Sequence, residues 1–114
     1  MGRVLQIRVS ASTFRDEDVV REWPRLVALA WPDEYVVPGG KGVLQLVGSL
    51  ADAHRFAGWK PDVREKLAPG IDKAVMLRAK LEEALADWNP REANALGDSL
   101  EETLDALENL APKP

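Results

Sequence analysis

The segment Val36–Val47 reads Val-Val-Pro-Gly-Gly-Lys-Gly-Val-Leu-Gln-Leu-Val and decides how the first half of the chain is expected to fold. Glycine readily adopts the positive φ values that tight hairpin turns require. Because β-branched residues lie on both sides of the glycines, we predict short strands over 35–37 and 43–47, joined by that turn. A helix over 43–47 stays open as an alternative, since its apolar residues also fit a period of 3.6.

The same glycines surround Lys41, so a phosphate-binding loop has to be weighed against the turn. A Walker-type loop has Ser or Thr directly after its lysine to bind magnesium, and a helix begins there. Here Gly42 follows Lys41, and we expect a strand next, so the motif fails in both respects. Lys41 is therefore expected on an exposed tip, available to an anion or an acidic partner.

Residues 3–10 alternate between apolar and polar side chains, which is typical of a half-buried strand. Acids at 16–18 then favour the start of a helix that runs to about Trp31. Pro24 interrupts this region, and it either kinks the helix or begins a second one. A right-handed crossover would let the first strand pair in parallel with residues 35–37, which gives a β-α-β-β beginning.

The second half of the chain is expected to be helical. Ser49 and Asp52 have the spacing of a capping pair, which predicts a short helix from Ser49 to about Phe56. Apolar periodicity predicts two longer helices, over about 71–88 and 91–110, separated by an Asn-Pro pair. Because the connection is short, these two helices should pack as an antiparallel hairpin. Their apolar stripes are Ile71, Ala74, Leu77, Leu81, Leu85 and Trp88, and Ala93, Leu96, Leu100, Leu104, Leu107 and Leu110.

Three tryptophans, Trp31, Trp59 and Trp88, lie one or two residues before a proline. Proline disfavours the helical conformation of the residue before it. We therefore expect these tryptophans to close helices, with their rings plugging the ends of the core.

Together these elements predict one α+β domain over residues 1–114. A small two- or three-stranded sheet would pack against helices. Residues 1–58 would form the β-α-β-β-α part, and residues 59–114 the helical part that ends in the helical hairpin.

The composition is that of a soluble globular protein. Of the 114 residues, 46% are hydrophobic and 30% are charged. There is no cysteine, which excludes disulfides, thiolate zinc sites and cysteine nucleophiles. No apolar run is long enough for a secretory signal or a membrane span, so we expect a cytoplasmic protein. The nine acids and two bases of residues 82–114 disfavour nucleic acid; they either solvate a helix face or attract basic surfaces.

No residue pattern indicates catalysis, and we expect no metal and no cofactor. His54 is the only histidine, and no second ligand stands at a metal-binding spacing from it. The acids at 16–18 and the pair Glu82-Glu83 would point apart on helices rather than around one ion. The candidate residues for a ligand site near the strand ends are Arg8, Lys41, His54, Arg55 and Trp59.

These observations favour a small bacterial-type protein that acts through protein–protein contacts, as an accessory subunit or adaptor. The contact, with a partner or in a homodimer, would use the apolar stripes of residues 71–110, because Val75 and Met76 add apolar surface that one partner helix does not cover. The predicted sheet could also cover that surface. One alternative function is a small ligand-binding or enzymatic α+β domain. A second is a ribbon-helix-helix-like DNA-binding dimer, in which Gln6 and Arg8 of the first strand would enter the major groove.

Overall fold

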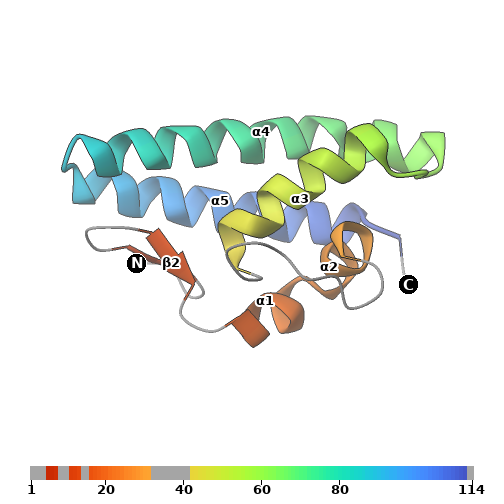
Figure 1. The fold of residues 1–114 in the computed structure, drawn as a ribbon, viewed down its shortest axis with the longest axis horizontal. Coiled ribbons are helices and arrows are strands. Elements are labelled where there is room, and N and C mark those ends of the chain that lie inside the picture. The colour runs from red at the N-terminus through yellow and green to blue at the C-terminus, as the bar shows by residue number, and fades with distance from the viewer. Residues whose placement is uncertain (1–4, 8–10, 14–15, 32–41, 113–114) are drawn as a thin grey trace.

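The computed structural model describes residues 5–7, 11–13, 16–31 and 42–112, and most of these residues lie in helices (Figure 1). Over these residues the helices are α1 (Asp16–Glu22), α2 (Pro24–Ala30), α3 (Val43–Phe56), α4 (Pro61–Ala86) and α5 (Pro90–Leu110). The expected α+β fold, with a sheet packed against helices, is therefore wrong.

The segment expected to build the sheet contains the start of α3 instead. Gly42 precedes the helix with an extended backbone, and its carbonyl accepts a hydrogen bond from the N–H of Leu46 at 2.9 Å. The residues buried along this helix are Val43, Leu46, Val47 and Leu50. Spacings of three and four place them on one face of a helix, whereas a strand would divide them between two faces. The predicted strand over 43–47 is wrong, and the helical alternative describes this segment.

Two short strands are described near the N-terminus, β1 (Leu5–Ile7) and β2 (Ala11–Thr13). They pair antiparallel, with Gln6 opposite Ser12, and β1 contacts α5. The expected β-α-β-β beginning is wrong, because β1 pairs with β2 and α3 replaces the third strand. The predicted strand over 35–37 and the turn after it lie outside the described residues.

Pro24 divides the first helical region into two helices rather than kinking one. α1 ends at Glu22, and Trp23 has a non-helical backbone with φ −131° and ψ 57°. Pro24 then takes the first turn of α2, where the missing N–H of proline costs no hydrogen bond. The side chain of Trp23 does not cap α2, so the free backbone N–H groups in the first turn of α2 need another acceptor.

Two acids of α5 hold this turn between α1 and α2. The Glu108 carboxylate accepts hydrogen bonds from the backbone N–H groups of Arg25 at 3.1 Å and Leu26 at 3.0 Å. The Asp105 carboxylate accepts a hydrogen bond from the indole Nε1 of Trp23 at 2.9 Å. Part of the acidic side of α5 is therefore an internal docking site for α2, and not only a solvated face.

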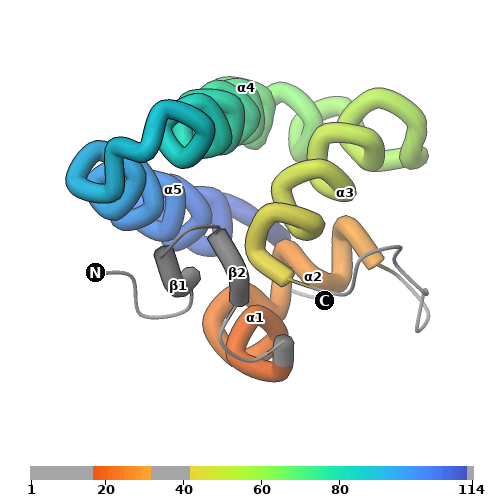
Figure 2. Tube along the Cα trace, turned by 60° about the vertical axis from the view of Figure 1, so that its left-hand side comes forward, coloured from red at the N-terminus to blue at the C-terminus, as the bar shows by residue number. Residues whose placement is uncertain are grey.

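Helix α4 begins earlier than the predicted helix over 71–88 and continues through Pro69. It packs antiparallel against α5 along most of its length, as the first two views show (Figure 1, Figure 2). The two helices are tightly packed at Gly70, where a Cβ atom would lie only 2.4 Å from Cδ2 of Leu107. The absence of a side chain at this position therefore leaves room for Leu107.

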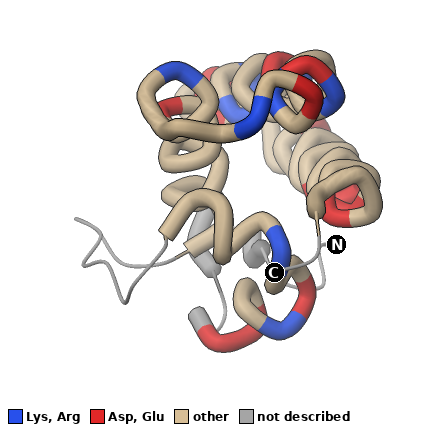
Figure 3. Tube along the Cα trace, turned by 90° about the vertical axis from the view of Figure 1, so that its right-hand side faces the viewer, with Lys and Arg blue, Asp and Glu red and all other residues tan. Residues whose placement is uncertain are grey.

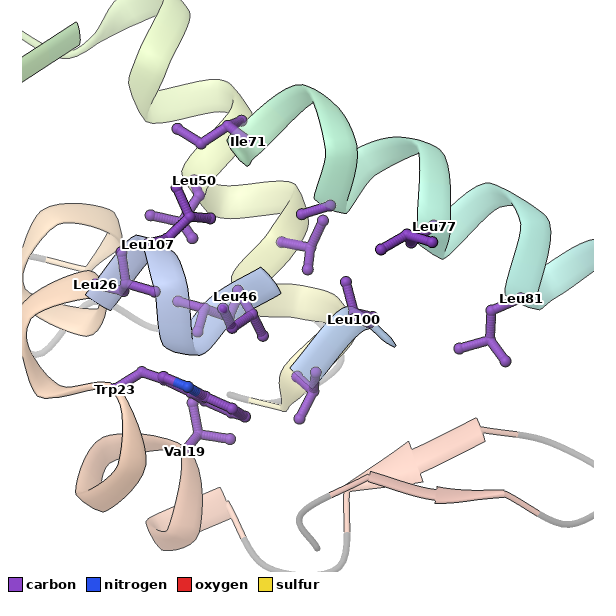
Figure 4. Close-up of a cluster of buried hydrophobic side chains, with 14 of the residues drawn as sticks. Val19, Trp23, Leu26, Leu46, Leu50, Ile71, Leu77, Leu81, Leu100 and Leu107 are labelled. Atoms are coloured by element: carbon purple, nitrogen blue, oxygen red, sulfur yellow. The ribbon is translucent and has the colours of Figure 1, made fainter. Parts of the chain in front are cut away.

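The core lies between the α4–α5 hairpin and the other helices (Figure 2, Figure 4). Helix α3 packs against α4 and α2, and α2 also contacts α5. The buried side chains labelled in Figure 4 come from all five helices and from the turn between α1 and α2, which supplies Trp23; the others are Val19, Leu26, Leu46, Leu50, Ile71, Leu77, Leu81, Leu100 and Leu107. Most of the predicted apolar stripes is thus buried inside the chain. Over the described residues, none of the helices has the length and apolar character that crossing a membrane requires.

The predicted roles of Ser49 and of the tryptophans are only partly right. Ser49 lies inside α3 and caps no helix start; its hydroxyl accepts a hydrogen bond from Nε1 of Trp31 at 2.8 Å. Trp31 is buried at the end of α2, as predicted, and Trp59 is half-buried. Trp88 is 77% exposed, so the expectation that its ring plugs the core is wrong.

Candidate functional site

His54 and Trp59, two of the candidate ligand residues, contact each other at the turn between α3 and α4. Their ring centroids lie 6.0 Å apart with the planes at 80°, which is an edge-to-face contact. The Nε2 atom of His54 lies 3.1 Å from the backbone oxygen of Arg64, so a proton on Nε2 is donated to that carbonyl. These contacts tie the end of α3 to the first turns of α4, which is a structural role.

Arg55 is exposed and lines a different surface, the groove between α3 and α4. Neither His54 nor Trp59 contributes to that groove. The other two candidates, Arg8 and Lys41, lie outside the described residues. The structure therefore brings His54 and Trp59 together in a packing contact and places Arg55 elsewhere.

The groove between α3 and α4, here called the α3–α4 groove, has a volume of about 400 Å³. Its lining residues are Val47, Gly48, Ala51, Asp52, Arg55, Val75, Arg78, Ala79 and Glu82. The Nη1 atom of Arg78 donates to the carbonyl of Leu44 at 2.8 Å, and its Nε atom donates to Glu82 at 2.9 Å. A Cβ atom at Gly48 would lie 2.9 Å from that Nη1 atom, so the glycine leaves room for the guanidinium to reach the backbone of α3.

The α3–α4 groove carries equal numbers of acids and bases beside an apolar floor. Asp52 and Glu82 balance Arg55 and Arg78, and both signs of charge are visible on α3 and α4 in Figure 3. Among the described residues, Asp52 and Arg55 form no hydrogen bond or ion pair. Val75, at the side of the groove, is 42% exposed. This surface is neutral overall and amphipathic.

A second groove lies between α4 and α5. Its volume is about 410 Å³, and its lining residues are Gly70, Lys73, Leu77, Ser99, Glu102, Thr103, Ala106, Leu107 and Leu110. The hydroxyl of Thr103 already donates to the carbonyl of Ser99 at 2.8 Å. Helix α5, which forms one wall, contains six acids and one base. Of these acids only Glu102 lines the groove, and Lys73 of α4 balances its charge.

Trp88 stands at the α4–α5 turn, at one end of the molecule (Figure 1). The backbone N–H of Trp88 donates to the carbonyl of Leu85 at 3.2 Å, and the backbone N–H of Asn89 donates to the carbonyl of Ala84 at 2.9 Å. This pair of bonds is the Schellman ending of a helix, in which the residue after the cap adopts the left-handed conformation. Glycine is usual there, but here Trp88 holds φ 56°, the one positive φ among described non-glycine residues.

Phe56 is a second exposed aromatic residue, at the last position of α3. Its side chain is 83% exposed, more than that of any other large hydrophobic residue described. It follows Arg55 directly, and it lies one helical turn after Asp52. Phe56 therefore stands beside the unpaired charges of the α3–α4 groove.

Known proteins supply no family for this chain: no protein-family model, no curated protein and no solved structure matches it. Among the described residues, no group of three or more His, Cys, Asp or Glu side chains is placed to hold a metal ion. The function therefore has to be argued from the surfaces described above.

Sequence reasoning missed the exposure of Trp88 and the internal contacts of two acids of α5. A signal for the first exists, because Trp88 fills the position between a helix and an Asn-Pro pair where glycine is usual. The second has no local signal, because Asp105 and Glu108 bind residues 82 and 83 positions away along the chain.

Proposed function

We propose that the protein acts by binding another protein, as an accessory subunit or adaptor, and that Trp88 is the anchor of this contact. The observation that supports it most is that a tryptophan with φ 56° is 77% exposed at the tip of the α4–α5 hairpin. Neither the turn nor the core gives a reason for this residue. Glycine would suit the backbone better, and the indole ring contributes little to the core.

The physical argument is one of cost and compensation. The left-handed conformation is unfavourable for a residue with a Cβ atom, by about 1–2 kcal/mol. Exposure of a large indole ring adds a further cost, because apolar surface stays in water. Binding offsets both: tryptophan is enriched among the residues that dominate protein interfaces, where its ring fills a pocket of the partner.

Charge at the same tip indicates the chemistry of the partner. Glu83 and Asp87 are exposed beside Trp88, and Glu102 is exposed further along α5. By contrast, Asp105 and Glu108 already bind α2 and are not available to a partner. An apolar pocket rimmed by Lys or Arg side chains would complement this surface.

The wider apolar stripes of residues 71–110 take part in this proposal only at their edges. Their central side chains, such as Leu81 and Leu100, are fully buried within the chain. Met76 and Leu110 are each 46% exposed, but both lie away from the α4–α5 turn, so Trp88 is the member of these stripes that the proposal uses.

The test compares three forms of the full chain as bait for partner proteins. Trp88→Gly removes the anchor and suits the turn, so we expect it to raise stability by about 0.5–1 kcal/mol while it abolishes capture. Val20→Ser is the matched control, because Val20 is an exposed apolar residue on α1, outside the hairpin. A protein captured by the wild type and by the control is then purified, and its affinity is measured. We expect Trp88→Gly to weaken binding at least tenfold; equal affinity for both forms would refute the proposal.

The two alternative functions gain less support. A ligand-binding or enzymatic domain would need its candidate residues in one pocket, and Arg55 lies apart from His54 and Trp59. A DNA-binding dimer would have to tolerate the six acids of α5, which repel the phosphate backbone.

A further inference from the structure

We infer that copies of this chain associate head to tail, through contact of the acidic tip of one copy with the basic tip of the next. The acidic tip is residues 83–92, at the α4–α5 turn, and the basic tip is residues 55–66, at the α3–α4 turn. The inference rests on the proposed role of Trp88 as an anchor, and it names the surface that receives this side chain.

The two tips carry the two most exposed aromatic side chains among the described residues. Phe56 is 83% exposed in the basic tip, and Trp88 is 77% exposed in the acidic tip. Helix α4 joins the tips and has 26 residues, so at 1.5 Å per residue they lie about 39 Å apart, at opposite ends of the molecule (Figure 1). One copy therefore cannot bring its own two tips together, whereas two copies can.

The tips have opposite net charges. The acidic tip has three acids and one base, a net charge of −2, and the basic tip has four bases and two acids, a net charge of +2. Of the ten described Lys and Arg residues, three form ion pairs with described acids, and four of the other seven lie in the basic tip, the end of the molecule that faces the viewer in Figure 3. These four bases are Arg55, Lys60, Arg64 and Lys66. Unpaired positive charge is therefore concentrated at the end of α4 that lies opposite Trp88.

The acidic tip has an electrostatic cost that a basic partner removes. Glu83 lies in the last turn of α4 and Asp87 is its C-cap, and that turn contains no base. The C-terminal end of a helix carries a partial negative charge, so acids there are unfavourable. A surface that brings Lys and Arg side chains to Trp88 would neutralise these acids. The chain itself has such a surface in its basic tip, so each copy meets its complement at the concentration of the protein itself.

The basic tip also has room for an indole ring. A Cβ atom added at Gly58 would meet nothing within 4 Å, so the turn between Phe56 and Trp59 is open at this residue. Trp59 is half-buried and contacts His54 edge to face, which holds its ring in place. Trp88 of the next copy can lie on this turn against Phe56, as aromatic side chains do in interfaces. The acids beside Trp88 then meet the bases of the basic tip.

The experiment measures the mass of the full chain by sedimentation and light scattering as the protein concentration rises. Contact between unlike surfaces does not stop at two copies, and the tips are small, so assemblies larger than a dimer should form at high concentration and low salt. Added salt should dissociate them, because exposed charges are screened. Trp88→Gly and Phe56→Asp should each weaken the association at least tenfold. Met76→Ser is the matched control, because Met76 is 46% exposed in the middle part of α4 and belongs to neither tip.

A mixture of the two tip variants tests whether unlike tips meet. Trp88→Gly keeps an intact basic tip and Phe56→Asp keeps an intact acidic tip. Each variant alone should be monomeric, and an equimolar mixture should form one-to-one dimers that cannot grow. Far-ultraviolet circular dichroism checks that both variants fold.

Three results would each overturn the inference: a monomeric wild type, a Trp88→Gly variant that associates like the wild type, or a mixture that stays monomeric. A monomeric wild type that captures a different protein through Trp88 would support the proposed function and overturn the inference, so the two fail separately.

Discussion

Glu108 offers the sharpest test of how the fold is held together, because it caps a helix that belongs to a distant part of the chain. Its carboxylate accepts hydrogen bonds from the backbone N–H groups of Arg25 and Leu26, at 3.1 Å and 3.0 Å. Its side chain is only 15% exposed. In Glu108→Ala these two N–H groups lose their acceptor in a partly buried place, so the attachment of α2 to α5 should weaken.

The expected loss of stability follows from these contacts. Removing a helix cap costs about 1 kcal/mol and up to about 2, and hydrogen bonds to a charged acceptor lie at the upper end of the usual range. The Nε atom of Arg25 lies 3.8 Å from the carboxylate, a distant and partly exposed ion pair that adds little. We expect Glu108→Ala to lower the free energy of unfolding by about 2 kcal/mol. For a chain of this size, the corresponding fall in Tm is about 8 °C.

Thermal and urea unfolding measure this change, and two control variants isolate its cause. Glu102→Ala removes an exposed acid from the same helix and should change stability by less than about 0.5 kcal/mol. Arg25→Ala removes the ion pair but keeps the backbone N–H, so its cost should stay below about 1 kcal/mol. If Glu108→Ala costs no more than Glu102→Ala, the capping argument is refuted. If Arg25→Ala costs as much as Glu108→Ala, the ion pair and not the cap holds α2.

Two further substitutions test the packing of α4 and α3. Gly70→Ala should destabilise the protein by about 1 kcal/mol, because overpacking against Leu107 outweighs the better helix propensity of alanine. Gly58→Ala is the control and should be nearly neutral, because nothing lies within 4 Å of the added Cβ. Equal unfolding midpoints for the two variants would contradict the tight contact between Gly70 and Leu107. Ser49→Ala should cost about 1–2 kcal/mol, because it leaves the indole N–H of the buried Trp31 without its acceptor. An unchanged urea midpoint would show that this hydrogen bond contributes nothing.

The helices of the second half could be predicted from the sequence because their signals are local and repeated. Regular apolar spacing places the last helix over 91–110, and α5 spans Pro90–Leu110. The same reasoning began the preceding helix about ten residues too late, because Pro69-Gly70 looks like the end of a helix. In the structure α4 continues through Pro69, since packing against α5 stabilises the helix more than one missing hydrogen bond destabilises it.

The first half was mispredicted where a short apolar segment fits two periods. Residues 43–47 suit a strand by composition and a helix by spacing, and five residues cannot distinguish them. Tertiary packing decides between helix and strand for this segment. The apolar face of the α4–α5 hairpin has to be covered, and α3 supplies four buried side chains on one face. A strand at this place would offer only alternate side chains to the same surface.

The candidate site shows the same division between local and tertiary information. The spacing of His54, Arg55 and Trp59 along the chain does not tell in which direction each side chain points. In the structure Arg55 lines a groove that the other two do not line. Trp88 was placed correctly at a helix end, yet its ring faces solvent, because the left-handed turn carries the side chain away from the core. Such directions depend on the backbone after the helix, which apolar periodicity does not describe.

The tip of the α4–α5 hairpin and the α3–α4 groove differ in their charged side chains. Acids that read as one continuous patch in the sequence have distinct roles in the fold: Asp105 and Glu108 bind α2, whereas Glu83 and Asp87 stay beside Trp88. The α3–α4 groove, by contrast, is balanced.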